Sequence, residues 1–179
     1  MTLALCGYAT RWDHIVHHHW DTVILCPNVF AKTLRSGATV RMLLNHNDDN
    51  CVGSTKDGTL QLHADEHGLA FRYYIIDTES GRHVQSMAEQ GSDCISVGFD
   101  WHGASKETRC INGVETLCIV STTLWEISYL TGRGAVKSAY GTLKDTDHFK
   151  TLGEECSGGR FLYHGAAVEF SRSLKALML

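Results

Sequence analysis

Long apolar runs are missing from this sequence of 179 residues, since no segment approaches the ~20 apolar residues of a membrane-spanning helix. Basic residues are not in excess either: 16 lysines and arginines against 20 aspartates and glutamates leave a net charge of −4. This balance argues against nucleic acid as a partner. The N-terminal stretch MTLALCGYATRWD has no basic region before its short apolar segment, so we expect no secretion signal. These absences predict a soluble globular protein without membrane or nucleic-acid partners.

Paired cysteines are also absent. The seven cysteines are scattered at positions 6, 26, 51, 94, 110, 118 and 156, and none forms a C-x-x-C pair. The spacing therefore excludes a zinc ribbon and a thioredoxin-like motif. We expect reduced thiols, mostly buried as small apolar side chains.

Proline is nearly absent (1 residue), glycine is frequent (17 residues), and β-branched runs recur, which favours many short strands. The chain between the first two strands is expected to be a polar loop through Asp21. A helix is expected over Asn28–Ser36, with Asn28 as N-cap and Gly37 at its exit, and a second over Thr78–Gln90. Asn112-Gly113 indicates a tight hairpin. The expected strands are Leu3–Ala9, Thr22–Cys26, Thr39–Asn45, Thr59–Ala64, Leu69–Asp77, Cys94–Trp101, Thr108–Ile111, Glu115–Ser121 and Leu124–Thr131.

This pattern predicts a mainly β (α+β) fold, a β-barrel with flanking helices, over residues 1–140. After Gly134 the chain becomes polar and glycine-rich, and a possible amphipathic helix follows at Ala166–Met178. We therefore assign residues 141–179 to a C-terminal extension. It is either a helix packed on the barrel or a tail removed by processing.

Three segments each place one chemically useful side chain in or beside an apolar strand. They carry the imidazole of His46, the hydroxyl of Ser96 and the carboxylate of Glu126. A base, a hydroxyl and an acid are the groups that activate a serine nucleophile. The order His, Ser, acid differs from the chymotrypsin, subtilisin and α/β-hydrolase orders, so any triad here belongs to another fold.

Each of the three also has a plainer interpretation. A histidine at a strand end is commonly structural, and a serine in a strand is commonly a small filler. Glu126 stands between Trp125 and Ile127, so we expect it to be partly buried and paired, either with a histidine N–H or with a lysine or arginine. Cys94, on the same strand face as Ser96, is a rival nucleophile.

Five short motifs decide between these interpretations: Gly7-Tyr8-Ala9, Pro27 to Phe30, Leu43-Leu44-Asn45-His46, Ser96-Val97-Gly98-Phe99 and Leu124-Trp125-Glu126-Ile127-Ser128. In this order, over roughly residues 5–135, they resemble the prohead (capsid maturation) proteases of tailed bacteriophages, relatives of the herpesvirus assemblins. The family pattern often has an aspartate directly after the histidine, where Asn47 stands here. It often has T-x-P-A after the acidic strand, whereas Thr131-Gly132-Arg133-Gly134-Ala135 has no proline. The missing proline concerns the conformation of the chain where it leaves the acidic strand, and not the three candidate side chains.

The resemblance implies an assemblin-like β-barrel and a serine endopeptidase with His46, Ser96 and Glu126 as its catalytic residues. It implies no cofactor. The expected substrates are scaffold and capsid proteins, and the protease itself, inside the immature capsid in the host cytoplasm. It also implies a homodimer. The alternative is an inactive assembly or scaffold protein of the same fold.

Two further segments have residue types that occur in metal sites or oxyanion sites. His17-His18-His19, with His14 before them, could bind a metal, but no matched ligands complete a tetrahedral set, so we expect a solvated loop and no metal. Gly132-Arg133-Gly134 could stabilise an oxyanion through backbone N–H groups or the guanidinium, but we favour a surface turn.

Overall fold

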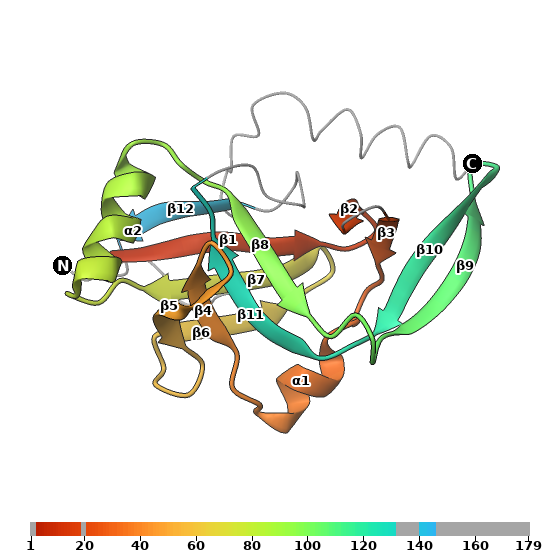
Figure 1. The fold of residues 1–179 in the computed structure, drawn as a ribbon, viewed down its shortest axis with the longest axis horizontal. Helices are drawn as coiled ribbons and strands as arrows, with labels where there is room; N and C mark the ends of the chain where they lie inside the picture. The colour runs from red at the N-terminus through yellow and green to blue at the C-terminus, as the bar shows by residue number, and fades with distance from the viewer. Residues whose placement is uncertain (1–2, 19–20, 132–139, 146–179) are drawn as a thin grey trace.

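The computed structural model describes residues 3–18, 21–131 and 140–145 (Figure 1). This part forms three four-stranded sheets and two helices. The predicted C-terminal helix at Ala166–Met178, the segment Gly132-Arg133-Gly134 and His19 lie outside the described residues. In the described part, no helix has the length and apolar character needed to cross a membrane.

The first sheet is entirely antiparallel and has the order β12-β1-β7-β6. Its strands are β1 (Leu3–Arg11), β6 (Leu60–Ala64), β7 (Gly68–Tyr74) and β12 (Tyr140–Asp145). Residues 4–10 of β1 are all buried, which explains why this strand is apolar without alternation. The pairing of β12 with β1 carries this sheet past the expected boundary at residue 140, and that strand was not predicted.

The second sheet holds all three predicted site segments and has the order β5-β4-β11-β8. Its strands are β4 (Arg41–Leu44), β5 (Asn47–Ser54), β8 (Ile95–Phe99) and β11 (Leu124–Tyr129). The central strand β11 is parallel to β4 and antiparallel to β8. Alternation along β8 turns Ile95, Val97 and Phe99 into the hydrophobic core and leaves Ser96 and Gly98 on the opposite face. We call that opposite face of the second sheet the site face.

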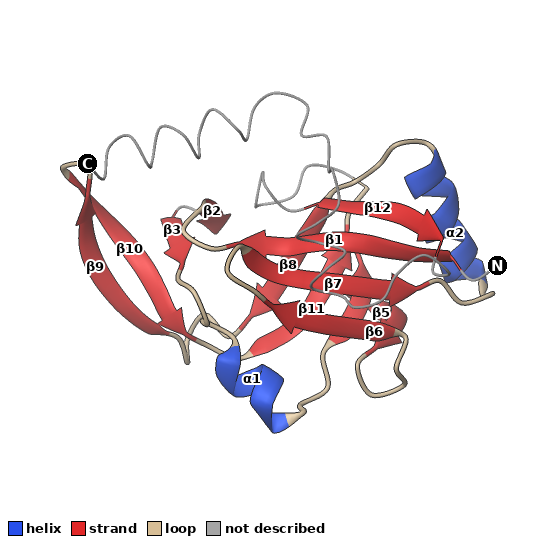
Figure 2. Ribbon diagram, turned by 180° about the vertical axis from the view of Figure 1, so that it is seen from behind, coloured by secondary structure: helices blue, strands red, loops and turns tan. Residues whose placement is uncertain are grey.

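The third sheet has the order β2-β3-β10-β9. Its strands are β2 (Ile15–His18), β3 (Asp21–Leu25), β9 (Ser105–Ile111) and β10 (Val114–Ser121). The β9–β10 hairpin extends away from the other two sheets (Figures 1 and 2). Positive φ angles of 55° at Asn112 and 77° at Gly113 confirm the predicted tight turn. The polar loop expected before Asp21 is wrong in part, because residues 15–18 pair with β3 despite their histidines.

The two helices are α1 (Ala31–Ser36) and α2 (Glu79–Glu89), and both lie at the ends of the sheets (Figure 2). The expected N-cap at Asn28 is wrong: Asn28 has a φ of 64° and belongs to a turn, and Phe30 precedes the helix. Gly37, with a φ of 66°, ends α1 as predicted. Thr78 caps α2 by accepting a hydrogen bond from the Gly81 N–H at 3.1 Å.

The main hydrophobic core lies between the first and second sheets and continues toward the third, where a smaller separate cluster surrounds Cys118. The largest fully buried members of the main core include Phe30, Phe71, Tyr73 and Tyr129. The predicted mainly β fold is therefore present, but the predicted barrel is not closed in the described part of the chain. Strand β8 packs against β1, yet the two belong to separate sheets and share no hydrogen-bonded ladder.

Candidate active site

His46 lies in a two-residue turn between β4 and β5. Asn45 and His46 both have positive φ angles, 53° and 56°, and Leu44 pairs with Asn47 across the turn. Asparagine is well suited to this left-handed conformation, and histidine adopts it more readily than most residues. Residues 47–50 follow this turn directly as the start of β5.

Hydrogen bonds to β11 hold this turn against the neighbouring strand. The Asn45 N–H donates to the carbonyl of Tyr129 at 3.0 Å. The Asn45 side-chain oxygen accepts from the N–H of Thr131 at 2.8 Å. The position of the His46 backbone is therefore set by β11, the strand that carries Glu126.

The carboxylate of Glu126 is the direct partner of the His46 ring. Glu126 is 6% exposed, and its Oε1 lies 2.6 Å from Nδ1 of His46. With the carboxylate ionised, Nδ1–H donates this bond, which leaves Nε2 as the free acceptor. Among the described residues, the buried carboxylate is thus paired with a histidine N–H and not with a lysine or arginine.

Ser128 supports both members of this pair, a role that the sequence analysis did not assign. Its hydroxyl donates to Oε2 of Glu126 at 2.7 Å and accepts from the backbone N–H of His46 at 3.0 Å. Its side chain is fully buried. The sequence does hold a clue to this role: Ser128 comes two residues after the buried Glu126, so alternation places both side chains on the same face of the strand.

A β-bulge and a glycine make room for Glu126. The pairing register of β11 with β8 shifts between Leu124 and Glu126, and Glu126 lies opposite Gly98. A Cβ atom on Gly98 would overlap the Glu126 carboxylate. The buried acid therefore occupies space that only a residue without a side chain leaves open.

Ser96 lies on the same face of the sheet, directly opposite Ser128 in the β8–β11 ladder. Opposite residues in an antiparallel pair have Cβ atoms about 4.5–5.5 Å apart, so Ser96 is close to the group that holds Glu126 and His46. Ser96 is 3% exposed. In the described part of the chain its hydroxyl makes no hydrogen bond, including none to His46. Such contacts in a free enzyme are often long and shorten when substrate binds.

The His46 ring is accessible to solvent and is basic. Its side chain is 45% exposed, while that of Glu126 is 8% exposed. The hydrogen bond that His46 donates to Glu126 raises the pKa of His46 above its ordinary value, although partial burial acts in the opposite direction. This arrangement supports an imidazole that takes up a proton at Nε2 while Glu126 stabilises the resulting cation.

The other candidates do not join this group. Cys94 is half-buried, with its Sγ 4.0 Å from the Asp93 carboxylate, and it remains a rival nucleophile only by its position beside β8. Among the described residues, no three histidines, cysteines or acids are placed to hold a metal ion. The side chains of His17 and His18 are not among those described.

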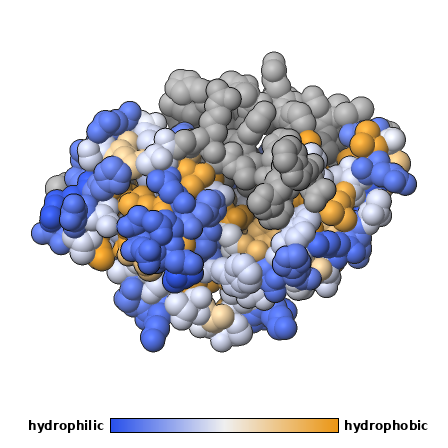
Figure 3. All heavy atoms as spheres, viewed as in Figure 1, coloured by the Kyte–Doolittle hydropathy of each residue, from blue (hydrophilic) through white to orange (hydrophobic). Residues whose placement is uncertain are grey.

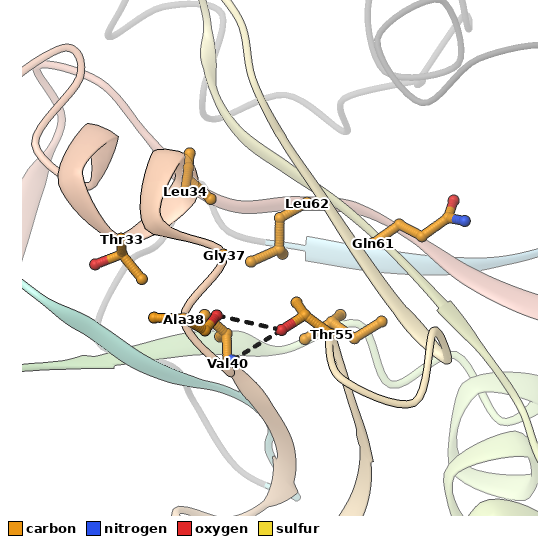
Figure 4. A pocket seen from close by; sticks show the side chains of 9 residues that line it. Thr33, Leu34, Gly37, Ala38, Val40, Thr55, Gln61 and Leu62 are labelled. Atoms are coloured by element: carbon orange, nitrogen blue, oxygen red, sulfur yellow. Dashed lines mark hydrogen bonds between the residues drawn. The ribbon is translucent and has the colours of Figure 1, made fainter.

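A separate cavity of about 350 Å³ lies beside α1, away from the predicted catalytic residues (Figure 4). Thr55 closes one side, accepting a hydrogen bond from the Val40 N–H at 3.0 Å. None of the described lining residues is a histidine, cysteine or carboxylate; they are Thr33, Leu34, Gly37, Ala38, Val40, Thr55, Leu60, Gln61 and Leu62. The cavity therefore offers no catalytic group of its own.

A solved structure of a herpesvirus protease shares this fold. The protease of Kaposi's sarcoma herpesvirus in complex with a hexapeptide phosphonate inhibitor aligns with a TM-score of 0.52 and 9% identity, over 99% of this chain and 77% of that one. The same protease with an allosteric inhibitor aligns with a TM-score of 0.49 and 11% identity, over 97% and 89% of the two chains. At these identities the similarity concerns the fold alone. No curated protein matches the sequence.

The sequence itself matches a protein-family description over residues 1–151, most of its length and all three candidate residues. That description is "Caudovirus prohead serine protease". The chain therefore belongs to the prohead serine proteases, the capsid-maturation proteases of tailed bacteriophages.

Proposed function

We propose that this protein is a serine endopeptidase in which Ser96 is the nucleophile, His46 the general base and Glu126 the acid that orients the base. The observation that carries this proposal is the 2.6 Å contact between His46 Nδ1 and Glu126 Oε1, on the sheet face where Ser96 stands. The family supports a serine protease reaction, and this geometry supports the choice of residues.

The chemistry follows the roles of a triad. Nε2 of His46 takes the proton of the Ser96 hydroxyl as its oxygen attacks the scissile carbonyl carbon. The imidazolium then gives that proton to the leaving amine, and an acyl-enzyme remains on Ser96. Water attacks the ester with the same imidazole as base, releasing the acid product and free Ser96. Glu126 stays ionised throughout and stabilises the imidazolium.

The proposed substrates are the scaffold and capsid proteins of the immature capsid, and the protease itself. The support is the family, whose proteases act in prohead maturation in the host cytoplasm. We also propose that the protein forms a homodimer. The support for this proposal is its likeness to the herpesvirus proteases. The extension over residues 141–179 stays a prediction, either as a packed helix or as a tail that the enzyme removes.

The alternative is an inactive assembly protein that keeps the fold. The hydrogen-bonded His46–Glu126 pair argues against it, because a buried acid held by a partly exposed histidine is costly to maintain without a use.

Purified wild-type protein and Ser96→Ala, incubated alone and with the phage's scaffold and capsid proteins, separate the two cases. We expect new fragments on SDS gels over time only with the wild type, and mass spectrometry would locate any cut in residues 141–179. Light scattering of the Ser96→Ala variant gives the oligomeric state. Stable substrates and an intact chain with folded wild-type protein would support the inactive alternative.

A further inference from the structure

The bulge that accommodates Glu126 also places an indole on the site face. Leu124 and Ile127 both belong to the hydrophobic core, so the two residues between them, Trp125 and Glu126, both lie on the opposite face. Without the bulge, strict alternation would bury one of them in the core. Trp125 is therefore a neighbour of the catalytic acid on the same surface.

Trp125 is unusually exposed for its size. It is 52% exposed, while Leu124 and Glu126 on either side are 1% and 6% exposed. It makes no ring contact or hydrogen bond with the described residues. Large aromatic side chains usually bury most of their surface and find a partner for the indole N–H, so this one is available to an incoming chain. Apolar surface is exposed on the side of the molecule where β8 and β11 cross in front of β1 (Figure 3).

The position of Trp125 on β11 sets its distance from Ser96, and so from the scissile bond of a bound substrate. Ser128 lies opposite Ser96, and Trp125 is three residues before Ser128 on β11. Because of the bulge, Trp125 lies between the levels of Gly98 and Phe99, which are two and three residues from Ser96. At about 3.3 Å per residue the indole is attached roughly 7–10 Å from the nucleophile along the strand. A substrate that lies extended along β11 on the site face has the same rise, so its side chain about three residues from the cleaved bond would reach the indole.

Charged groups stand on the other flank of Glu126. Arg41 on β4 is paired in register with Glu126 and forms an ion pair with Asp48 at 2.6 Å. Because the Arg41 guanidinium is already paired with Asp48, the Trp125 indole is the group beside Glu126 that offers an apolar surface. Its flat face favours a large aliphatic or aromatic side chain over a carboxylate.

We propose that Trp125 is a specificity-determining residue whose indole binds a large apolar side chain of the substrate, about three residues from the scissile bond. This inference rests on the proposed function, because it requires Ser96 to be the nucleophile.

The test combines a small probe with a peptide library. A fluorophosphonate reports only on the triad, since it is too small to span the distance to Trp125. Cleavage profiling of a peptide library by mass spectrometry reports on the subsite. We expect Trp125→Ala to keep the labelling rate within about twofold of wild type but to lose about tenfold in kcat/KM for peptides with Leu, Met or Phe at the selected position. Peptides with Ala there should be cleaved at nearly the wild-type rate.

Three further variants make the outcomes distinct. Trp125→Phe should retain the preference, and Val114→Ala, which removes exposed apolar surface on the distant hairpin, should change nothing. Trp125→Arg should move the preference toward acidic side chains, and it serves as the test if Trp125→Ala does not fold. An unchanged cleavage profile in labelled, folded Trp125 variants would overturn the subsite and leave the protease intact. Loss of labelling in these folded variants would make Trp125 part of the triad's support and would also overturn it. A wild type that neither labels nor cleaves would overturn the proposed function itself.

Discussion

Gly98 and Glu126 lie directly opposite each other on β8 and β11, and the Glu126 carboxylate occupies the space beside the Gly98 Cα. The glycine two residues after Ser96 is thus explained by the acid on the neighbouring strand. β8 and β11 fit together at this level only with this pairing of residue types.

Gly98→Ala is expected to displace the carboxylate from His46 and to lower kcat/KM by about 100-fold, because an unoriented imidazole is a poor base. Peptide cleavage and the melting temperature should be measured together. The control is Gly53→Ala, whose Cβ would overlap Thr59 and Tyr73 away from the triad and should reduce stability more than activity per folded molecule. Wild-type activity in Gly98→Ala would show that Glu126 does not need its present position.

Ser128→Ala removes a hydroxyl that holds both Glu126 and the His46 backbone. We expect a loss of about 1–3 kcal/mol in the free energy of unfolding, since a buried carboxylate loses a donor. We also expect a drop of about tenfold in kcat with little change in KM. Thr33→Ala is the matched control, because it loses a buried hydrogen bond, from the Leu124 N–H at 3.0 Å, outside the triad. If Ser128→Ala, like Thr33→Ala, loses stability but keeps the wild-type kcat, Ser128 has a structural role only.

The pH dependence follows from the pKa of His46, which Glu126 raises above the ordinary value of 6.5. The free base is populated as pH rises through this raised pKa, so kcat/KM should rise over the same range, above pH 6.5. The contribution of the pair to stability has the opposite sense: it is fully present below pH 6.5 and is lost as pH rises through the raised pKa.

Glu126→Gln should lower the pKa of His46 and move this limb of the profile to lower pH. The maximal rate should fall by roughly 10⁴-fold, the loss caused by the corresponding change in a chymotrypsin-type triad. NMR titration of His46 in the Ser96→Ala background, with and without Glu126→Gln, measures the shift directly. An unchanged His46 pKa would contradict the hydrogen bond as its cause.

Much of the site could be predicted because its residues stand in strands with a clear alternation. The apolar neighbours of Ser96 and Glu126 identify their strands, and burial of an acid calls for a partner such as His46. The bulge at Trp125 could not be predicted, because it depends on which residues of β8 lie opposite. The role of Ser128 depends in turn on that register.

The fold was predicted less evenly. The Asn112-Gly113 turn and the exit of α1 at Gly37 are local, since each requires a positive φ that these residues adopt easily. β2, β5 and β12 were missed because tertiary pairing decides them: residues 15–18 hold histidines, residues 47–50 are all polar, and residues 140–145 follow a glycine-rich stretch. Barrel closure also depends on pairing between distant strands, which alternation cannot supply.

Replacing His17, His18 and His19 together with alanine should leave proteolysis within about threefold of wild type, because histidines without a matched set of ligands supply no chemistry. A chelator such as 1,10-phenanthroline should likewise have no effect. Cleavage assays of the variant, with and without added zinc, check this expectation. Abolished activity in the variant, restored in the wild type by zinc after chelation, would establish a metal site there.

The most direct test of the triad is to label the protein with a fluorophosphonate and locate the modified residue by mass spectrometry, in wild type, Ser96→Ala, His46→Ala and Cys94→Ala. We expect label on Ser96 in the wild type and in Cys94→Ala, and none in Ser96→Ala or His46→Ala, with all four proteins folded by circular dichroism. Cleavage should follow the same pattern, and the Ser96→Ala, His46→Ala double variant should be no worse than either single variant. Label on another residue, or cleavage by folded Ser96→Ala at the wild-type rate, would contradict Ser96 as the nucleophile.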